Sequence, residues 1–154
     1  MEPGRRGLFR FSLRPRNTRA LVMAVVRVIC AIGKSGQLGL NGRLPWEGNR
    51  DAVYKDDVHR FFALTRGHVL IAGPRTISSF PEWAHAERTL VTIHSSDEPE
   101  LILKLYRDRV IFVGGGPPVW KAYAHLIQHW DITRLPYDGP ADRYFDPMWL
   151  CPGR

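Results

Sequence analysis

The stretch Val110-Ile-Phe-Val-Gly-Gly-Gly-Pro-Pro-Val-Trp-Lys-Ala-Tyr123 decides the fold class. Its first four residues are apolar and mostly β-branched, which predicts a short strand buried on both faces. A helix is predicted directly after the three glycines, from Val119 to about Ile127. This order is how open α/β sheets bring main chain close to a phosphate, because glycine allows near approach and a helix start offers free N–H groups.

The glycine run by itself has two interpretations. Alone, it is more typical of a plain tight turn than of a phosphate site. It also lacks the GxGxxG spacing of a Rossmann fingerprint. Further evidence must come from the rest of the chain.

Strand and helix patterns alternate along the sequence. Strands are predicted at 24–32, 68–72, 88–93, 110–113 and 129–135, and helices at 55–66, 77–80, 95–106 and 119–127. Such alternation predicts an α/β fold with a central, mostly parallel sheet and flanking helices. With no repeat and no long linker, we expect a single domain over 23–154, preceded by a basic arm over 1–22.

The positive charge belongs to that arm. Of the formal net charge of +7, residues 1–20 carry +5, from six arginines against Glu2, and residues 21–154 carry only +2. A nucleic-acid-binding protein would need a basic stripe on its folded part, so we expect no nucleic-acid partner. The arm is predicted to be flexible and solvated, although an organelle transit peptide or a true start at Met23 would also fit.

Cysteine and hydropathy patterns predict a cytoplasmic protein without metal. Cys30 and Cys151 have no metal-ligand spacing, and Cys30 lies in an apolar strand pattern typical of a small buried side chain. No apolar run approaches the length of a membrane span. Between Gly33 and Trp46, four glycines punctuate a loop with an apolar side, which is typical of a lid over a pocket.

Five pieces of the chain, in order, resemble dihydrofolate reductase. They are Ile29-Cys-Ala31, Gly39-Leu-Asn-Gly-Arg-Leu-Pro-Trp46, Asp57-Val-His-Arg-Phe61, Val69-Leu-Ile-Ala-Gly-Pro-Arg-Thr76, and Val113-Gly-Gly-Gly with Trp120. The resemblance runs from about Val25 to Phe145. It implies a central sheet with four flanking helices and an unusual cis Gly-Gly bond. It also implies NADPH-dependent reduction of 7,8-dihydrofolate to tetrahydrofolate, a step of one-carbon metabolism.

The resemblance assigns a substrate pocket around Asp57. Reducing a pterin requires a hydride donor, a proton for the ring nitrogen and a carboxylate for the pterin amide edge. The implied catalytic residues are Asp57, Trp46 and Thr133. The implied substrate-binding residues are Ile29, Asp57, Val58, Phe61, Phe80, Arg88 and Thr133, with Arg88 on the glutamyl α-carboxylate of folate.

Several of these assignments have competitors. Asp56 and Asp57 would also suit simple helix-start charges, and Asp51 lies at the family's usual distance from Trp46. Choosing Asp57 keeps the helix register but requires about six inserted residues, which are predicted to loop out at the pocket mouth. A solvated strand-end charge remains the alternative for Arg88.

For the cofactor, the resemblance implies two groups of residues. The nicotinamide end would be lined by Ala31, Leu38 and Gly39. The phosphates and adenosine would be held by Gly73, Arg75, Thr76, His94, Ser95, Gly114, Gly115, Gly116 and Trp120. Arg75 lies one place later than is usual in the family, so NADPH and NADH are not separated by sequence. Trp120 would equally suit a core position.

The chain also stops where the family continues into a final antiparallel hairpin. This predicts an exposed sheet edge, covered by another chain, by the N-terminal arm or by nothing, hence a monomer or a dimer. A related pyrimidine reductase of riboflavin synthesis, or a relative that binds a pterin or nucleotide without turnover, are the alternatives for function.

Overall fold

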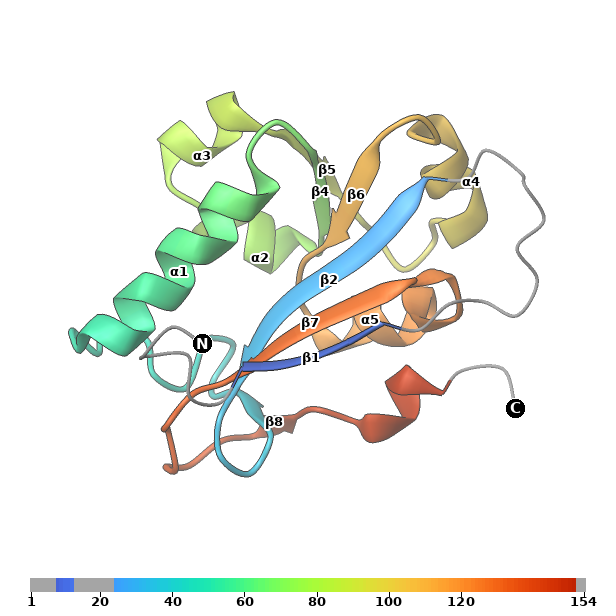
Figure 1. Cartoon of the computed structure of the whole chain (residues 1–154). Coiled ribbons are helices and arrows are strands. Elements are labelled where there is room, and N and C mark those ends of the chain that lie inside the picture. The colour runs from blue at the N-terminus through green and yellow to red at the C-terminus, as the bar shows by residue number, and fades with distance from the viewer. Residues whose placement is uncertain (1–7, 13–23, 152–154) are drawn as a thin grey trace.

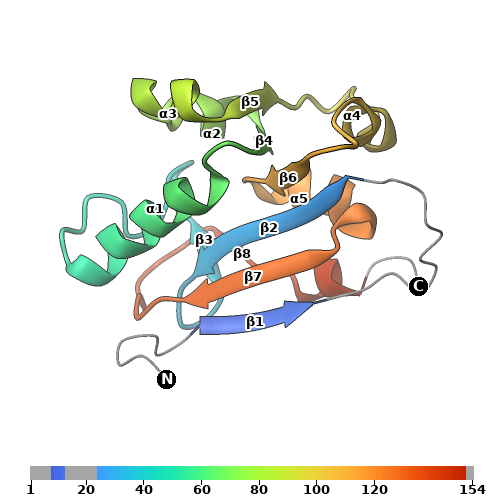
Figure 2. The same ribbon diagram turned by 45° about the horizontal axis from the view of Figure 1, so that its top comes forward.

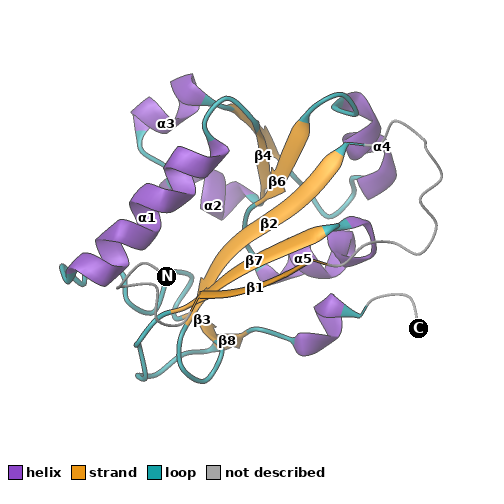
Figure 3. Ribbon diagram, viewed as in Figure 1, coloured by secondary structure: helices purple, strands orange, loops and turns teal. Residues whose placement is uncertain are grey.

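The computed structural model describes residues 8–12 and 24–151. Five α-helices are described: α1 (Ala52–Thr65), α2 (Pro74–Ser79), α3 (Glu82–Glu87), α4 (Pro99–Leu105) and α5 (Pro117–Tyr123). The strands are β1 (Leu8–Ser12), β2 (Val25–Ile32), β3 (Gln37–Gly39), β4 (Val69–Ala72), β5 (Thr89–Thr92), β6 (Val110–Val113), β7 (His129–Arg134) and β8 (Arg143–Tyr144). Two short 3₁₀ helices, η1 (Ala124–Leu126) and η2 (Pro147–Leu150), complete the elements (Figure 3).

Six of the strands form one twisted sheet in the order β1-β7-β2-β6-β4-β5 (Figure 1). Strands β7, β2, β6, β4 and β5 are parallel to their neighbours in this series, and β1 alone is antiparallel. The predicted α/β class with a mostly parallel sheet is therefore confirmed. A second sheet of two short strands pairs β3 with β8.

The sheet has helices on both faces, because successive strand residues point to opposite sides. On one face, alternate residues of the central strands pack with α4, α5 and η2 in the larger core, which includes Val28, Val113, Trp120, Trp130 and Trp149. On the other face, Ile29, Leu70 and Phe112 pack against α1 through Phe61. Figure 2 shows β1 next to β7 at one edge of the sheet and β5 at the other.

The edge of β7 is covered by the N-terminal segment. Leu8 lies opposite Thr133 and Ser12 lies opposite His129, in antiparallel register. Of the three possibilities left open for a free sheet edge, the arm is the one observed. Within the predicted flexible arm, residues 8–12 thus form a strand, whereas 1–7 and 13–22 lie outside the described residues.

Helix boundaries differ more from prediction than strand boundaries. Helix α1 begins at Ala52 rather than near residue 55, because Tyr54 packs on Trp46 and draws this polar segment into the helix. Helix α2 begins at Pro74, which suits a first helical position, and α3 was not predicted at all. In the described part of the chain, no helix combines the length and apolarity that crossing a membrane requires.

Candidate active site

Asp57 lies inside helix α1 and faces the sheet. The helix already has five residues before it, so the extra segment after Trp46 lengthens the helix and does not loop out as predicted. The side chain is partly buried, and this burial raises the pKa of Asp57 to about 6. Arg60 opposes the rise and Asp131 adds to it. The carboxyl group therefore exchanges its proton near neutral pH, as an acid catalyst requires.

An ion pair lies one helical turn beyond Asp57. The Arg60 Nη2 donates to Asp131 Oδ2 at 2.7 Å, and the two side chains are 25% and 26% exposed. Asp131 is on β7, two residues before Thr133, so both side chains point to the face that α1 covers. Neither Arg60 nor Asp131 was predicted as a site residue. The sequence nevertheless contained a signal for each: Arg60 lies three residues after Asp57, and Asp131 lies two residues before Thr133.

Three buried polar atoms around this ion pair lack hydrogen-bond partners within residues 8–12 and 24–151. They are the indole Nε1 of Trp46, the Oγ1 of Thr133 and the Nη1 of Arg60. Buried polar groups are almost always satisfied, so such a group indicates a missing polar partner. Thr133 lies opposite Ala31 across β2 and β7, and Ala31 packs on the cluster that contains Trp46. Trp46 and Thr133 therefore both lie next to Ala31, and Trp46 also packs on Tyr54, one turn before Asp57.

Trp46 is held in that place by aromatic contacts. Its ring stacks on Tyr54 of α1 at 6.1 Å and meets Tyr137 edge-on at 5.6 Å. Tyr54 lies one turn before Asp57, so the tryptophan packs against the helix that carries the acid. Only 4% of Trp46 is exposed.

The apolar wall beside Asp57 contains three predicted substrate residues. Ile29, Phe61 and Phe80 belong to the smaller core on the α1 side, and the Phe61 and Phe80 rings are 6.0 Å apart. Val58, also predicted, is 40% exposed. A flat apolar wall next to an acid is what a pterin ring would contact.

Arg88 lies in a different environment from the one predicted. Its side chain has no exposed surface. The guanidinium donates to the carbonyls of Ala84 and Phe62, to the Thr65 hydroxyl and to Glu87. It also lies over the Phe62 ring at 5.0 Å. Neither a solvated strand-end charge nor a grip on a substrate carboxylate matches this position; Arg88 links α1, α3 and β5.

The two rival acids lie away from the pocket. Asp51 precedes α1 as its N-cap residue, and its carbonyl accepts from the amides of Tyr54 and Lys55. Asp51 and Asp56 are both exposed. Among these three aspartates, Asp57 is thus the one whose burial changes its chemistry.

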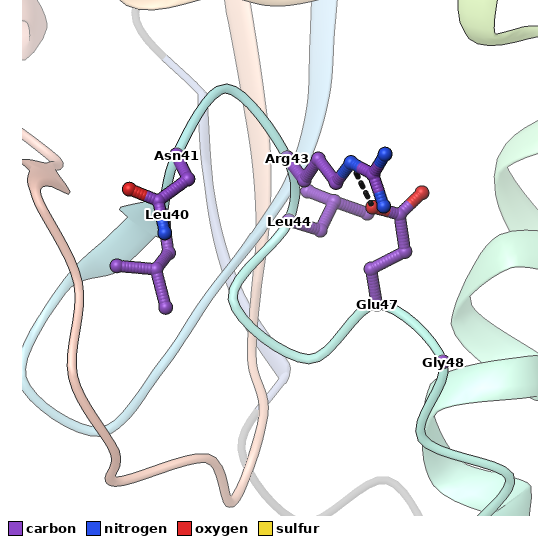
Figure 4. Close-up of a pocket in the computed structure, with 6 residues that line it drawn as sticks. All are labelled: Leu40, Asn41, Arg43, Leu44, Glu47 and Gly48. Atoms are coloured by element: carbon purple, nitrogen blue, oxygen red, sulfur yellow. Dashed lines mark ion pairs between the residues drawn. The ribbon is translucent and has the colours of Figure 1, made fainter.

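The predicted lid is a loop with a hollow of its own. This hollow, of about 430 Å³, is lined by Leu40, Asn41, Arg43, Leu44, Glu47 and Gly48 (Figure 4). Arg43 and Glu47 form an ion pair at 3.7 Å across one side of it. Of the residues predicted at the nicotinamide end, Ala31 and Gly39 are half-buried, whereas Leu38 is buried in the larger core.

The glycine turn brings the ends of β4 and β6 together. The Gly73 amide donates to the Gly115 carbonyl at 3.1 Å, and Gly115 is joined to Gly116 by the implied cis peptide bond. Gly114 is packed tightly, since a Cβ there would lie 3.2 Å from that of Ala72. Within the described residues, the amides of Gly115 and Gly116 donate no hydrogen bond, so main-chain donors are left for an anionic group.

The other predicted cofactor residues differ in their exposure to solvent. Thr76 is near the turn, its Oγ1 3.5 Å from where a Gly115 Cβ would be, and the exposed Arg75 reaches the tip of the lid loop at Gly42. His94 and Ser95 are exposed after β5. Trp120, by contrast, is buried and donates to the Val113 carbonyl at 3.3 Å, so it occupies the core position.

Comparison with known proteins agrees with this arrangement. The model of the family "Dihydrofolate reductase" matches residues 25–149. The chain belongs to the dihydrofolate reductase family. It is also 64% identical, over 131 residues, to the dihydromethanopterin reductase of Methylorubrum extorquens, a match covering 85% of this chain and 97% of that protein.

The relative corrects the predicted activity. A protein so similar, matched over nearly its whole length, is named for dihydromethanopterin. The prediction that this chain is a dihydrofolate reductase, making tetrahydrofolate, is therefore wrong, although its family was identified correctly. An oxidoreductase of this family binds a small pterin substrate and generally uses a nicotinamide cofactor.

Proposed function

We propose that this chain reduces dihydromethanopterin with NADPH as the hydride donor. The observation that carries the proposal is the 64% identity to a reductase named for that substrate, over 97% of its length. The position of Arg88 supports the change of substrate. A folate reductase needs a cation for the glutamyl carboxylate, and the guanidinium of Arg88 has no exposed surface and is bound by internal acceptors.

Asp57 would be the acid of the reaction. Reduction converts a C=N bond of the pterin to CH–NH, so hydride goes to the carbon and a proton to the nitrogen. With a pKa raised to about 6 by burial, Asp57 keeps a proton for part of the time at neutral pH. It can hold the amide edge of the ring, while Thr133 and Trp46 supply hydrogen-bonding groups that have no partner among the described residues.

The residues present fit a nicotinamide dinucleotide. When bound, NADPH supplies the hydride. The unused amides of Gly115 and Gly116 and the first turn of α2 can receive its pyrophosphate, because helix starts and glycine turns favour anions. Arg75 is the exposed cation nearest this turn among the predicted cofactor residues, and it is the candidate for a 2′-phosphate.

A substrate comparison tests the proposal. Loss of NADPH absorbance is followed with dihydromethanopterin or dihydrofolate, and then with NADH in place of NADPH. We expect kcat/KM for dihydromethanopterin to exceed that for dihydrofolate by at least about tenfold. Equal or faster turnover of dihydrofolate, or no turnover by protein shown to be folded, would contradict it.

A further inference from the structure

The ion pair between Arg60 and Asp131 connects the two elements that carry Asp57 and Thr133. Arg60 is on α1, three residues after Asp57, and therefore lies on the same face of the helix. Asp131 is on β7, on the same face as Thr133. The 2.7 Å contact thus fixes the helix that carries the acid to the strand that carries its hydroxyl neighbour.

The same ion pair decides which carboxylate binds the arginine. A guanidinium one turn from Asp57 could pair with it, and such a pair would hold the carboxyl group ionised. Instead, Arg60 donates to Asp131. The charged groups that act on Asp57 are Arg60 from its own helix and Asp131 from β7, and Asp57 in turn acts on the Cys30 thiol of β2. Cys30 is neutral, because burial raises the pKa of its thiol.

We propose that the Arg60–Asp131 ion pair is a positioning element for Asp57, which fixes α1 against β7 and keeps the arginine away from the catalytic carboxyl group. This inference rests on the proposed function for its kinetic consequences alone. Its geometric content concerns the free protein and can be tested without substrate.

Opposite changes are expected from the two halves of the ion pair. Asp131→Asn removes a negative neighbour and releases Arg60 toward Asp57, so the Asp57 pKa should fall by about one unit. Arg60→Met removes the cation that lowers the pKa of Asp57, so the Asp57 pKa should rise by about one unit. Arg60→Lys keeps the charge and should restore most of the wild-type value.

Carbon-13 NMR of labelled aspartate carboxyls measures this directly. The Asp57 signal is assigned by its absence from Asp57→Asn, and each variant is titrated from pH 3 to 9 after its fold is checked by circular dichroism. Arg66→Met is the matched control. Arg66 is the C-cap residue of the same helix and pairs with Glu87 at 3.0 Å, but its side chain is 67% exposed.

The kinetic measurement gives an independent result. The kcat/KM for dihydromethanopterin should fall at high pH. The pH of this fall should be lower in Asp131→Asn and higher in Arg60→Met than in the wild type. The KM for NADPH should stay within about twofold, because the glycine turn is untouched. An ion pair that held α1 to β7 without acting on Asp57 would lower stability without moving the two profiles in opposite directions.

The outcomes separate the two proposals. Opposite NMR shifts without turnover of dihydromethanopterin would support the positioning role and reject the proposed function. Turnover with no shift, with shifts in one direction, or with an equal shift in Arg66→Met would overturn the positioning role and leave the proposed function standing.

Discussion

Two polar regions of the substrate side, around Arg88 and around Asp57, were both predicted to bind the substrate and are built in opposite ways. At Arg88, the cation has no exposed surface and donates to several protein acceptors. At Asp57, the acid is partly exposed, and neighbouring donors such as Trp46 Nε1 remain without a partner in the described residues.

The difference shows how to separate a structural polar residue from a functional one. A charge that is fully hydrogen-bonded to its own protein stabilises the fold and has little left for a ligand. A site that leaves buried groups unused costs stability until a ligand supplies the missing partners. In the sequence, Arg88 and Asp57 were both charged residues predicted to bind the substrate. Their hydrogen-bond partners in the structure distinguish them.

The largest expected effect is on catalysis at the Asp57 region. Asp57→Asn removes the proton donor while keeping the shape of the side chain, so kcat should fall by about 10² or more. Steady-state turnover of dihydromethanopterin at pH 7 measures it. Asp56→Asn, an exposed neighbour on the same helix, is the control and should stay within about twofold of wild type. Comparable losses in both would mean that the helix register is wrong.

At the Arg88 region, the expected effect is on stability. Arg88→Met leaves the carbonyls of Ala84 and Phe62 and the Thr65 hydroxyl without their donor. We expect the free energy of unfolding to fall by about 2–3 kcal/mol, as judged by urea denaturation. The exposed Arg66→Met should cost under about 0.5 kcal/mol. A large rise in KM for the pterin without loss of stability would instead indicate that Arg88 binds the substrate.

The raised pKa of Asp57 predicts how stability depends on pH. The folded protein holds this proton up to about pH 6, whereas the ordinary value is 3.8. Between these values the folded state binds more protons, so its unfolding free energy falls as pH rises. Relative to Asp57→Asn, wild type should lose about 1–2 kcal/mol between pH 4 and pH 7, after allowance for the partial exposure of the group. A constant difference in urea denaturation across this range would contradict the shift.

The smallest expected effect concerns the support of β7 by β1. Deleting residues 1–12 removes the strand opposite Thr133 and uncovers the edge of β7. The unfolding free energy should fall by about 1 kcal/mol. The open edge should also promote association, which sedimentation at increasing protein concentration would detect. Unchanged stability and sedimentation would mean that β1 contributes little to the Asp57 region.

Local sequence patterns were sufficient to predict most of the sheet. The strands β2, β4, β5, β6 and β7 were each placed to within one residue at either end, because β-branched runs and bounding glycines are local signals. Strand β1 had no such local signal. Its five residues lie in an arginine-rich segment, and they form a strand because they pair with β7, which is far away in the sequence. The early start of α1 depends on the Tyr54 contact with Trp46, which is also nonlocal.

The site could be predicted only where a motif carries the information. Asp57, Trp46 and Thr133 came from ordered motifs; in the structure Trp46 packs on Tyr54, one turn before Asp57, and Thr133 pairs with Ala31 beside the Trp46 cluster. The pairing of Arg60 with Asp131 joins residues 71 positions apart, and no spacing rule links them before the chain folds. The burial of Arg88 depends on α3, a helix that was not predicted, because Ala84 and Glu87 are two of its acceptors.

The pairing of β1 with β7 has a consequence for synthesis of the chain. The strand at residues 8–12 is made well before its neighbour at residues 129–134. At a translation rate of about 5–20 residues per second, β1 waits on the order of ten seconds for β7. During that interval its backbone amides and carbonyls are available to other nascent chains. The codons between the two strands therefore set how long this segment is exposed to aggregation or to chaperones.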